Sequence, residues 1–405
     1  MFLFSIAMIL VLGAATSRLF AIIKVPNMLG LILVGVIMGP FFGNLLSPDL
    51  LRISGDLRML ALVIILLRAG LGISREALNK VGKTALKMSA IPCLFEGGTV
   101  TLIGHLLLDL PWLEAGMLGF VIAAVSPAVV VPEMLRLQEK RLGHDKAIPV
   151  IILGGASIDD VFAITILTAL LGIGTGSGQA SVVSQLGRIP LEVLGGVMLG
   201  LALGLVLSAI FKSSRIPTTE SDEIIIAIGA ALAVVLIGQN LHVAGLLSVM
   251  ATGFVLLERA PKVAHRLSDK LKKVWLPAEI FLFTLIGAQV DLTVALQAGL
   301  MGLAVIAIGL VGRSAGVFLA TAGTDLNLKE RLFCAVAYLP KATVQAAVGG
   351  LPLAAGVSSG SLILAVAVLS IVFTAPLGAW GMRLLAPRFL QAATGISPEP
   401  QLADD

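Results

Sequence analysis

The sequence predicts an all-α polytopic membrane protein. Hydrophobic residues make up 58% of the 405 and charged residues only 13%, whereas a soluble domain usually carries about twice that charge. Mean hydropathy is +1.04. A helix needs about 20 mostly apolar residues to cross a bilayer, and the chain holds many such stretches. Alternating ten-residue barrel strands do not occur, so we expect the backbone to satisfy its hydrogen bonds within helices.

Apolar runs bounded by Pro, Gly and charged residues predict about 13 transmembrane helices. Seven of them begin near Leu3, Asn27, Leu57, Ala85, Leu113, Ile148 and Ile189. Six more begin near Glu223, Ala244, Leu276, Val294, Arg331 and Ser361. The first run has no basic flank before it and no obvious cleavage site after it, so we expect it to remain as the first helix. Cys93 and Cys334 fall inside apolar segments, where a cysteine is most often a packing residue.

The distribution of basic residues supports this division and predicts an orientation. Placing alternate loops on alternate sides puts 21 of the 28 Lys and Arg residues on one side, and Lys24 and Arg215 are among them. Only Arg52, Arg58 and Arg188 fall on the other side. Because basic loops stay in the cytoplasm, we expect the N-terminus outside and the C-terminus inside. We expect the protein to lie in the plasma (inner) membrane. The net charge of +4 reflects this loop bias, so no nucleic-acid partner is expected.

Two apolar segments contain internal prolines at matching positions. The run from Ala124 to Pro132 lies in the fifth segment, and the run from Ala337 to Thr343 lies in the twelfth. Proline removes a backbone donor, so each helix is expected to unwind there. Residues 1–390 then form a single transporter unit of two inverted six-helix repeats, about 1–173 and 222–385, with crossed discontinuous helices. A linker helix spans about 187–212, and residues 391–405 form a short cytoplasmic tail.

The clearest candidate for chemistry is the adjacent pair Asp159 and Asp160, in the middle of the sixth segment. Neighbouring helix positions point about 100° apart, so the two carboxylates face different surroundings. A buried carboxylate exchanges protons, and its oxygen atoms also suit a small hard cation such as Na⁺. A site that binds either a proton or a cation gives exchange by competition. No cofactor is required beyond the transported ions.

Further charged residues lie within apolar segments, where an unpaired charge is expensive. Lys341 lies at the second proline break and is the natural partner of one of the two aspartates. Glu96 and Arg313 are expected to form a second buried pair, either as a gate or as a brace. Lys341 has two possible roles, releasing a proton when the cation arrives or staying charged throughout. Arg68, near the inner end of its segment, is expected to anchor to lipid headgroups.

Together these runs resemble the sodium/proton exchangers of the cation:proton antiporter superfamily. The double acid Asp159-Asp160 matches its double-aspartate division. The runs from Ala124 to Pro132 and from Leu339 to Ala347 resemble the NHA-type branch. The resemblance covers essentially the whole membrane part of the chain.

This resemblance implies a homodimer in which each protomer has a dimerisation domain and an ion-carrying core domain that moves like an elevator. By position, it implies that Asp160 is the principal site for Na⁺, Li⁺ or H⁺, and that Asp159 forms an ion pair with Lys341. It also implies that Ser126 lies near the ion and that Glu96 interacts with Arg313. Because no long soluble domain follows Leu385, the potassium efflux systems that carry such domains are disfavoured.

Three other functions fit parts of the sequence. An intramembrane aspartyl protease needs its two aspartates on separate helices, whereas here they are consecutive, so we do not expect an enzyme. A passive channel must release ions quickly, which two broken helices around a charged site disfavour. A sodium-coupled symporter of organic anions on the same fold is the alternative that fold analogy leaves open. The titratable acids favour proton exchange over that symporter.

Overall fold

The computed structural model describes residues 2–22, 26–175, 187–212 and 219–392. Lys24, Arg215 and nearly all of the expected tail therefore lie outside the described residues. Within them the regular secondary structure is helical, apart from one isolated antiparallel bridge between Leu142 and Ala392. Helices in the first half of the chain are α1 (Phe2–Ile22), α2 (Asn27–Met38), α3 (Pro48–Arg52), α4 (Ser54–Gly70), α5 (Arg75–Leu108), α6 (Trp112–Ile122), α7 (Pro127–Glu139) and α8 (Ile148–Gly174).

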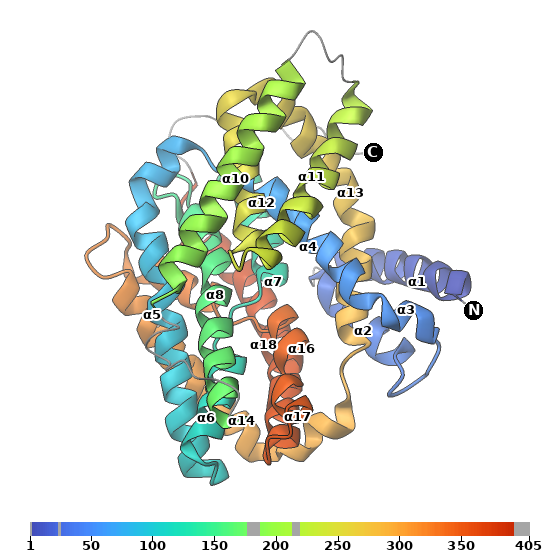
Figure 1. Cartoon of the computed structure of the whole chain (residues 1–405), viewed down its shortest axis with the longest axis vertical. Coiled ribbons are helices and arrows are strands. Elements are labelled where there is room, and N and C mark those ends of the chain that lie inside the picture. Colours follow the sequence, from blue (N-terminus) through green and yellow to red (C-terminus); the bar gives the residue numbers. More distant parts are fainter. Residues whose placement is uncertain (1, 23–25, 176–186, 213–218, 393–405) are drawn as a thin grey trace.

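The second half of the chain is built in the same way (Figure 1). Its helices are α10 (Ile189–Lys212), α11 (Glu220–Asn240), α12 (Gly245–Arg259), α13 (Pro261–Gly287), α14 (Leu292–Ala320), α15 (Leu328–Ala337), α16 (Thr343–Val348), α17 (Leu351–Ala354) and α18 (Gly360–Phe389). Polar caps define several starts. Ser74 Oγ accepts from the Ala77 N–H at the start of α5, and Asn327 with Glu330 forms a capping box on α15.

Eight helical spans in the described residues are long and apolar enough to cross a bilayer, which makes the chain an integral membrane protein. One of them joins α6 and α7 across the first break. The remaining predicted segments fall on helices that are shorter, such as α2 and α12, or that carry many charges, such as α13. Thirteen crossings therefore stay a prediction, although every predicted start lies close to or within a helix of the described chain.

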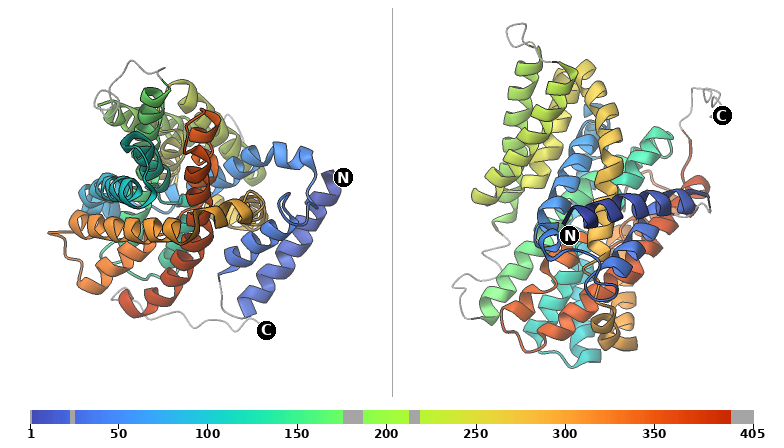
Figure 2. Two further views of the ribbon diagram at one scale, coloured as in Figure 1. Left: turned by 90° about the horizontal axis from the view of Figure 1, so that it is seen from below. Right: turned by 90° about the vertical axis from the view of Figure 1, so that its right-hand side faces the viewer.

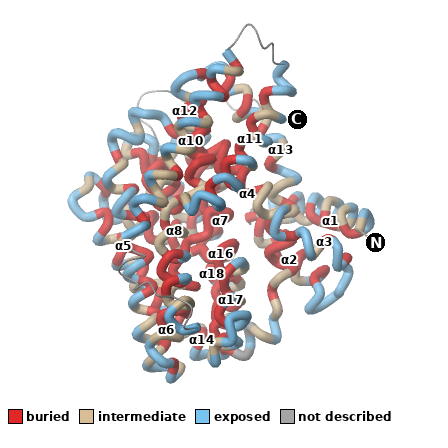
Figure 3. The backbone as a smooth tube through the Cα atoms, viewed as in Figure 1, coloured by how far each residue is buried: buried red, intermediate tan, exposed pale blue. Residues whose placement is uncertain are grey.

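The helices pack as two bundles. One, the core bundle, consists of α5, α6, α7, α8, α14, α15, α16 and α18. The other, the flanking bundle, consists of α1, α2, α4, α10, α11, α12 and α13. In Figure 2 α1 lies on the outside of the molecule, and in Figure 3 the buried backbone is concentrated around α7, α8 and α18. The bundles meet where α4 touches α7 and where α10 and α12 touch α8.

Glycine allows very close helix packing inside the flanking bundle. A Cβ atom at Gly70 of α4 would lie 2.1 Å from the carbonyl oxygen of Met250 on α12. A Cβ atom at Gly253 of α12 would lie 2.6 Å from the carbonyl oxygen of Leu67 on α4. No larger side chain fits at either position, so the end of α4 is held tightly against α12.

Both predicted helix breaks are present. The first separates α6, which ends at Ile122, from α7, which begins at Pro127. The second separates α15, which ends at Ala337, from α16, which begins at Thr343. The breaks contact each other, because the N–H of Ser126 donates to the carbonyl oxygen of Pro340 over 2.8 Å. Unwound backbone from two distant parts of the chain is thus brought together inside the core bundle.

Candidate ion-binding site

Asp159 lies on α8, fully buried beside the first helix break. Its Oδ2 accepts the N–H of Val125 over 2.7 Å, one of the backbone donors freed by the break. Arg313 of α14 donates from Nη2 to both carboxylate oxygens, over 3.0 and 3.1 Å. Asp159 is therefore held by one backbone donor and one cation, both aimed at it by separate elements of the core bundle.

Glu96 of α5 joins the same group of charges. Its Oε2 accepts from Arg313 Nη1 over 2.7 Å and from Lys341 Nζ over 2.6 Å. Arg313 Nη1 also donates to the carbonyl oxygen of Ala123, at the end of α6. All three charged side chains are completely buried. The predicted pairing of Glu96 with Arg313 is present, and it forms part of a continuous network rather than a separate pair.

Lys341 occupies a different place from the one expected. The expected ion pair with Asp159 does not form, because Lys341 Nζ binds Glu96 and Arg313 takes the position beside Asp159. A backbone hydrogen bond of Lys341 explains part of this pairing. The N–H of Lys341 donates to Thr374 Oγ1 of α18 over 2.8 Å, which fixes where the lysine side chain starts. The sequence predicts three acids and two bases in this region, and the fold decides which of them pair.

Asp160 forms no hydrogen bond or ion pair with the described residues. Its Oδ1 is fully buried and has no partner there. Ser157, three positions earlier on the same face of α8, donates to Met250 Sδ of α12 over 2.9 Å. Asp160 thus lies on the face of α8 that is turned toward the flanking bundle, while Asp159 points into the core bundle. The predicted separation of the two carboxylates is present.

Ser126, the last predicted site residue, lies where the two breaks meet. Its Oγ lies 3.3 Å from Thr343 Oγ1, and the N–H of Thr343 donates to it over 3.4 Å. Sequence reasoning missed Gln345, whose side-chain amide donates to the carbonyl oxygens of Ala124, Ile122 and Val121 at the end of α6. A buried amide two residues after a break was the available signal, since a polar side chain there must find partners.

Tyr338 is a second residue that sequence reasoning missed. The guanidinium carbon of Arg313 lies 5.1 Å from the centre of its ring, within the range of a cation–π interaction. Its hydroxyl is fully buried without a partner among the described residues, and a Cβ atom at Gly155 would lie 2.0 Å from it. Gly155 is one turn before Asp159 on the same face of α8. Tyr338 is the only tyrosine in the sequence, which was the available signal.

Arg68 does not anchor to headgroups as expected. It is buried at the end of α4, and its Nη2 donates to Glu139 Oε1 at the end of α7 over 2.6 Å. The expectation treated a basic residue near a helix end as facing lipid. Here α7 brings a carboxylate to it, so the charge is satisfied inside the protein.

Comparison with known proteins identifies the family. The sodium/hydrogen exchanger transmembrane family matches residues 6–385. The chain is 35% identical to mouse sodium/hydrogen exchanger 9B2 over 96% of its own length and 74% of the relative's. It is 32% identical to human sodium/hydrogen exchanger 9B1, over 90% of this chain and 72% of the relative.

Solved structures share the fold. The sodium proton antiporter MjNhaP1 of Methanocaldococcus jannaschii superimposes with a TM-score of 0.76 at 21% identity, over 94% of this chain and 96% of that one. Its structure at pH 8 gives a TM-score of 0.74 at 20% identity, over 95% and 97%. Paired broken helices around buried charges define a secondary ion transporter, not an enzyme. The chain belongs to the sodium/hydrogen exchanger family.

Proposed function

We propose that this chain exchanges Na⁺ for H⁺ by competition at Asp159 and Asp160, with Asp160 as the principal site. The observation that carries this assignment is the buried, partnerless Oδ1 of Asp160 beside a network in which Asp159 is already paired. A buried carboxylate without a partner is strongly unfavourable unless it binds a cation or a proton. Competition between the two then couples their movements.

The charges of the group support a single occupant. Glu96, Asp159 and Asp160 supply three acids, whereas Arg313 and Lys341 supply two bases. With all five ionised the group carries one excess negative charge, which one Na⁺ or one H⁺ neutralises. Because uncompensated charge inside a membrane is unfavourable, the empty and fully ionised site is the least stable of the three states.

Na⁺ reaches oxygen ligands in this arrangement without any cofactor. Carboxylate, hydroxyl and carbonyl oxygens are the ligands that hard cations prefer. Asp160 supplies the charge, and Asp159 is the preceding residue on α8. Ser126 supplies a hydroxyl where the two breaks meet. We propose that these three residues hold the transported ion, with Li⁺ as a further substrate.

We further propose that the core bundle moves against the flanking bundle in an elevator-like cycle. The core bundle contains both breaks and the five charged residues of this group, whereas the main contacts between the bundles involve a few helix pairs. Inverted repeats, thirteen crossings and a homodimer formed through the flanking bundle complete this proposal. The distribution of basic loops supports a cytoplasmic C-terminus and an outside N-terminus, and we propose the plasma (inner) membrane as the location.

Proton movement in sealed proteoliposomes tests the proposed exchange. A pH-sensitive dye reports the response to sodium, lithium, potassium or an organic anion, each added in turn. We expect Na⁺ to drive proton release, and Asp160→Asn to lose at least tenfold of that rate while still folding. Retained exchange in Asp160→Asn would overturn the assignment. Sodium uptake that depends on an organic anion, without any proton signal, would instead establish the symporter.

A further inference from the structure

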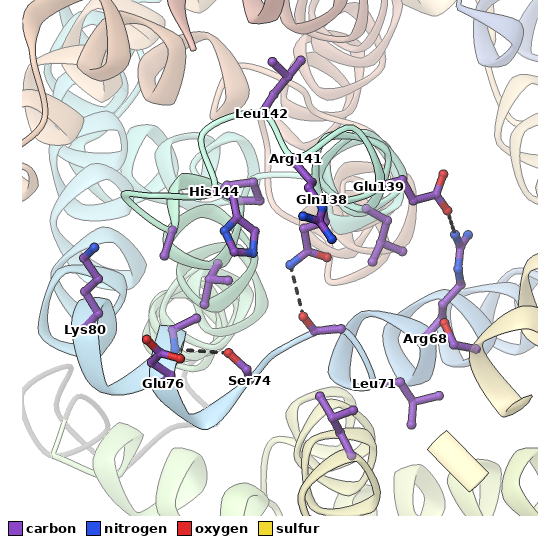
Figure 4. A pocket seen from close by; sticks show the side chains of 18 of the residues that line it. Arg68, Leu71, Ser74, Glu76, Lys80, Gln138, Glu139, Arg141, Leu142 and His144 are labelled. Atoms are coloured by element: carbon purple, nitrogen blue, oxygen red, sulfur yellow. Dashed lines mark hydrogen bonds and ion pairs between the residues drawn. The ribbon is translucent and has the colours of Figure 1, made fainter. Parts of the chain in front are cut away.

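Glu139, the last residue of α7, is held by two cations from the flanking bundle. Its Oε1 accepts from Arg68 Nη2 of α4 over 2.6 Å and lies 3.1 Å from Lys272 Nζ of α13. Figure 4 shows the first of these pairs at the edge of a cleft. α7 belongs to the core bundle, so one carboxylate connects it to two separate helices of the other bundle.

Other ion pairs in the described chain have a different arrangement. Arg383 with Glu133 lies within the core bundle, over 2.7 Å. Lys270 with Glu220 lies within the flanking bundle, over 3.0 Å. These pairs hold helices of one bundle together and are unaffected when the bundles move relative to each other. The two pairs of Glu139 cross from one bundle to the other, so relative movement of the bundles changes their distances.

Both ends of this connection are firmly attached to their own bundle. Arg68 lies two residues before Gly70, where α4 packs directly on the backbone of α12. On the other side, Glu133 fixes the middle of α7 to Arg383 of α18. α7 begins at Pro127, next to the ion site, and its 13 residues span about 20 Å. The half-helix α7 therefore links the ion site to Glu139.

An acidic residue at the end of a helix is unfavourable by itself. The C-terminal end of a helix carries a partial negative charge, which repels a carboxylate in the last turn. Glu139 is partly exposed, and it is stabilised there by Arg68 and Lys272. The position is therefore favourable mainly while the flanking bundle supplies its two cations.

Arg68 and Glu139 border a cleft of about 770 Å³ between the bundles. Its walls come from the ends of α4 and α7, the starts of α5 and α8, and from α12 and α13. Arg68 and Glu139 lie on one edge, with His144 and Lys80 further along the wall (Figure 4). In this structure the cleft is open and both ion pairs of Glu139 are formed.

We propose that Glu139, Arg68 and Lys272 form an inter-bundle latch that stabilises the conformation with this cleft open. The proposal rests on the elevator movement proposed above. Interactions present in one state and absent in the other shift the equilibrium between them by their own free energy. Breaking the latch shifts the population toward the opposite conformation without touching the ion site.

Apparent Na⁺ affinity measured from each side of the membrane tests the latch. An ion site that is open to one side for a smaller fraction of time binds more weakly from that side. In oriented vesicles we expect Glu139→Gln to raise the apparent KM for Na⁺ on the cleft side and to lower it on the other, each by roughly three- to tenfold. High ionic strength should reduce the difference between wild type and variant.

Glu220→Gln is the matched control, since it removes the same charge from an ion pair inside one bundle. Arg68→Gln combined with Glu139→Gln should change the KM values no more than Glu139→Gln alone, because the two residues share one interaction. Equal changes on both sides, or no change on either, would overturn the latch.

A second measurement does not depend on transport. Ser268 lines the cleft, and the native Cys93 and Cys334 are buried, so Ser268→Cys gives a specific label site. We expect Glu139→Gln to slow its reaction with a membrane-impermeant maleimide, and an unchanged rate counts against the latch.

If wild type exchanges ions and Asp160→Asn does not, the proposed function stands whatever the latch variants show. Absence of exchange in wild type would refute the proposed function but not the latch, because the labelling rate tests the latch separately.

Discussion

Five charged side chains lie close together in the core bundle, and four of them are fully buried and depend on their neighbours. Arg313 binds both Glu96 and Asp159, so it connects the two acids that lie on α5 and α8. Lys341 completes the pairing of Glu96 from the second break. Removing one member of such a network leaves another charge buried and unpaired, which costs about 3–5 kcal/mol. Asp160 is the exception, because its proposed partner is the transported ion.

The ring of Tyr338 is expected to hold the Arg313 guanidinium in place. A desolvated cation–π contact contributes about 2 kcal/mol, so Tyr338→Leu should reduce exchange at least tenfold and shift its pH profile. Tyr338→Phe keeps the ring and removes a hydroxyl that has no partner among the described residues. This variant should exchange ions normally and be at least as stable as wild type. Dye-based exchange assays between pH 6 and 9 would measure both.

Loss of exchange in Tyr338→Phe would show that the hydroxyl acts in transport and would contradict the role given to the ring. An unchanged pH profile in Tyr338→Leu would do the same. Thermal unfolding of each purified variant separates these outcomes from simple misfolding.

For individual residues, the sequence predicted which charged side chains matter but not all of their partners. A charge within an apolar segment stands out, which is why Asp159, Asp160, Glu96, Arg313 and Lys341 were found. Distances between helices decide the pairing, and no local pattern contains them. Tyr338 was missed because an aromatic residue in an apolar segment looks like a packing residue.

The two broken helices support each other through side chains as well as backbone. Gln345 of α16 donates to the carbonyl oxygen of Ala124 over 2.9 Å and accepts the N–H of Ala342 over 2.9 Å. Its amide therefore satisfies groups from both breaks at once. Such groups would otherwise be buried without partners, where each is destabilising.

Gln345→Ala should lower the free energy of unfolding by about 1–3 kcal/mol, since it leaves a carbonyl of the first break and an amide of the second unsatisfied. Gln138→Ala is the matched control, because Gln138 makes only a long contact of 3.4 Å to the carbonyl oxygen of Gly72 near the surface. That substitution should stay within about 0.5 kcal/mol of wild type. Thermal unfolding in detergent would measure both, and equal stability of the two variants would contradict the bridging role.

Helix breaks were predictable because proline acts locally. Pro127 and Pro340 mark both of them correctly within a few residues. The contact between the breaks depends on how the halves of the chain pack, which the matched positions suggested but did not specify. The number of crossings is harder to predict. Helices that are short, such as α12, or charged, such as α13, are not recognised as membrane spans by hydropathy alone.

Most helices of the described residues belong to one of two bundles that differ in character. The core bundle holds the proposed ion site, and the flanking bundle presents much of its apolar surface outward, as in α1. Their division was expected from family resemblance, whereas the connection at Glu139 was not, because Arg68 was interpreted as a lipid anchor. Long-range ion pairs of this kind are visible only after the fold is known.

Loop accessibility tests the proposed orientation of the molecule. Lys83 and Arg188 are both exposed in the structure and lie on opposite sides in the positive-inside assignment. In intact cells a membrane-impermeant maleimide should react with Arg188→Cys and not with Lys83→Cys. The reverse pattern would invert the orientation, and labelling of both would show that the two loops share a side.

Competition between Na⁺ and H⁺ for one site at Asp160 is the basis of the proposed exchange. Its most direct test is the equilibrium dissociation constant of Na⁺ for the purified protein, measured by calorimetry from pH 5 to pH 9. Competition with one proton predicts that this constant rises about tenfold for each unit of pH decrease at the acidic end and levels off at the alkaline end, with no binding by Asp160→Asn. A dissociation constant that stays the same across this range would contradict the account, because Na⁺ and H⁺ would then bind independently.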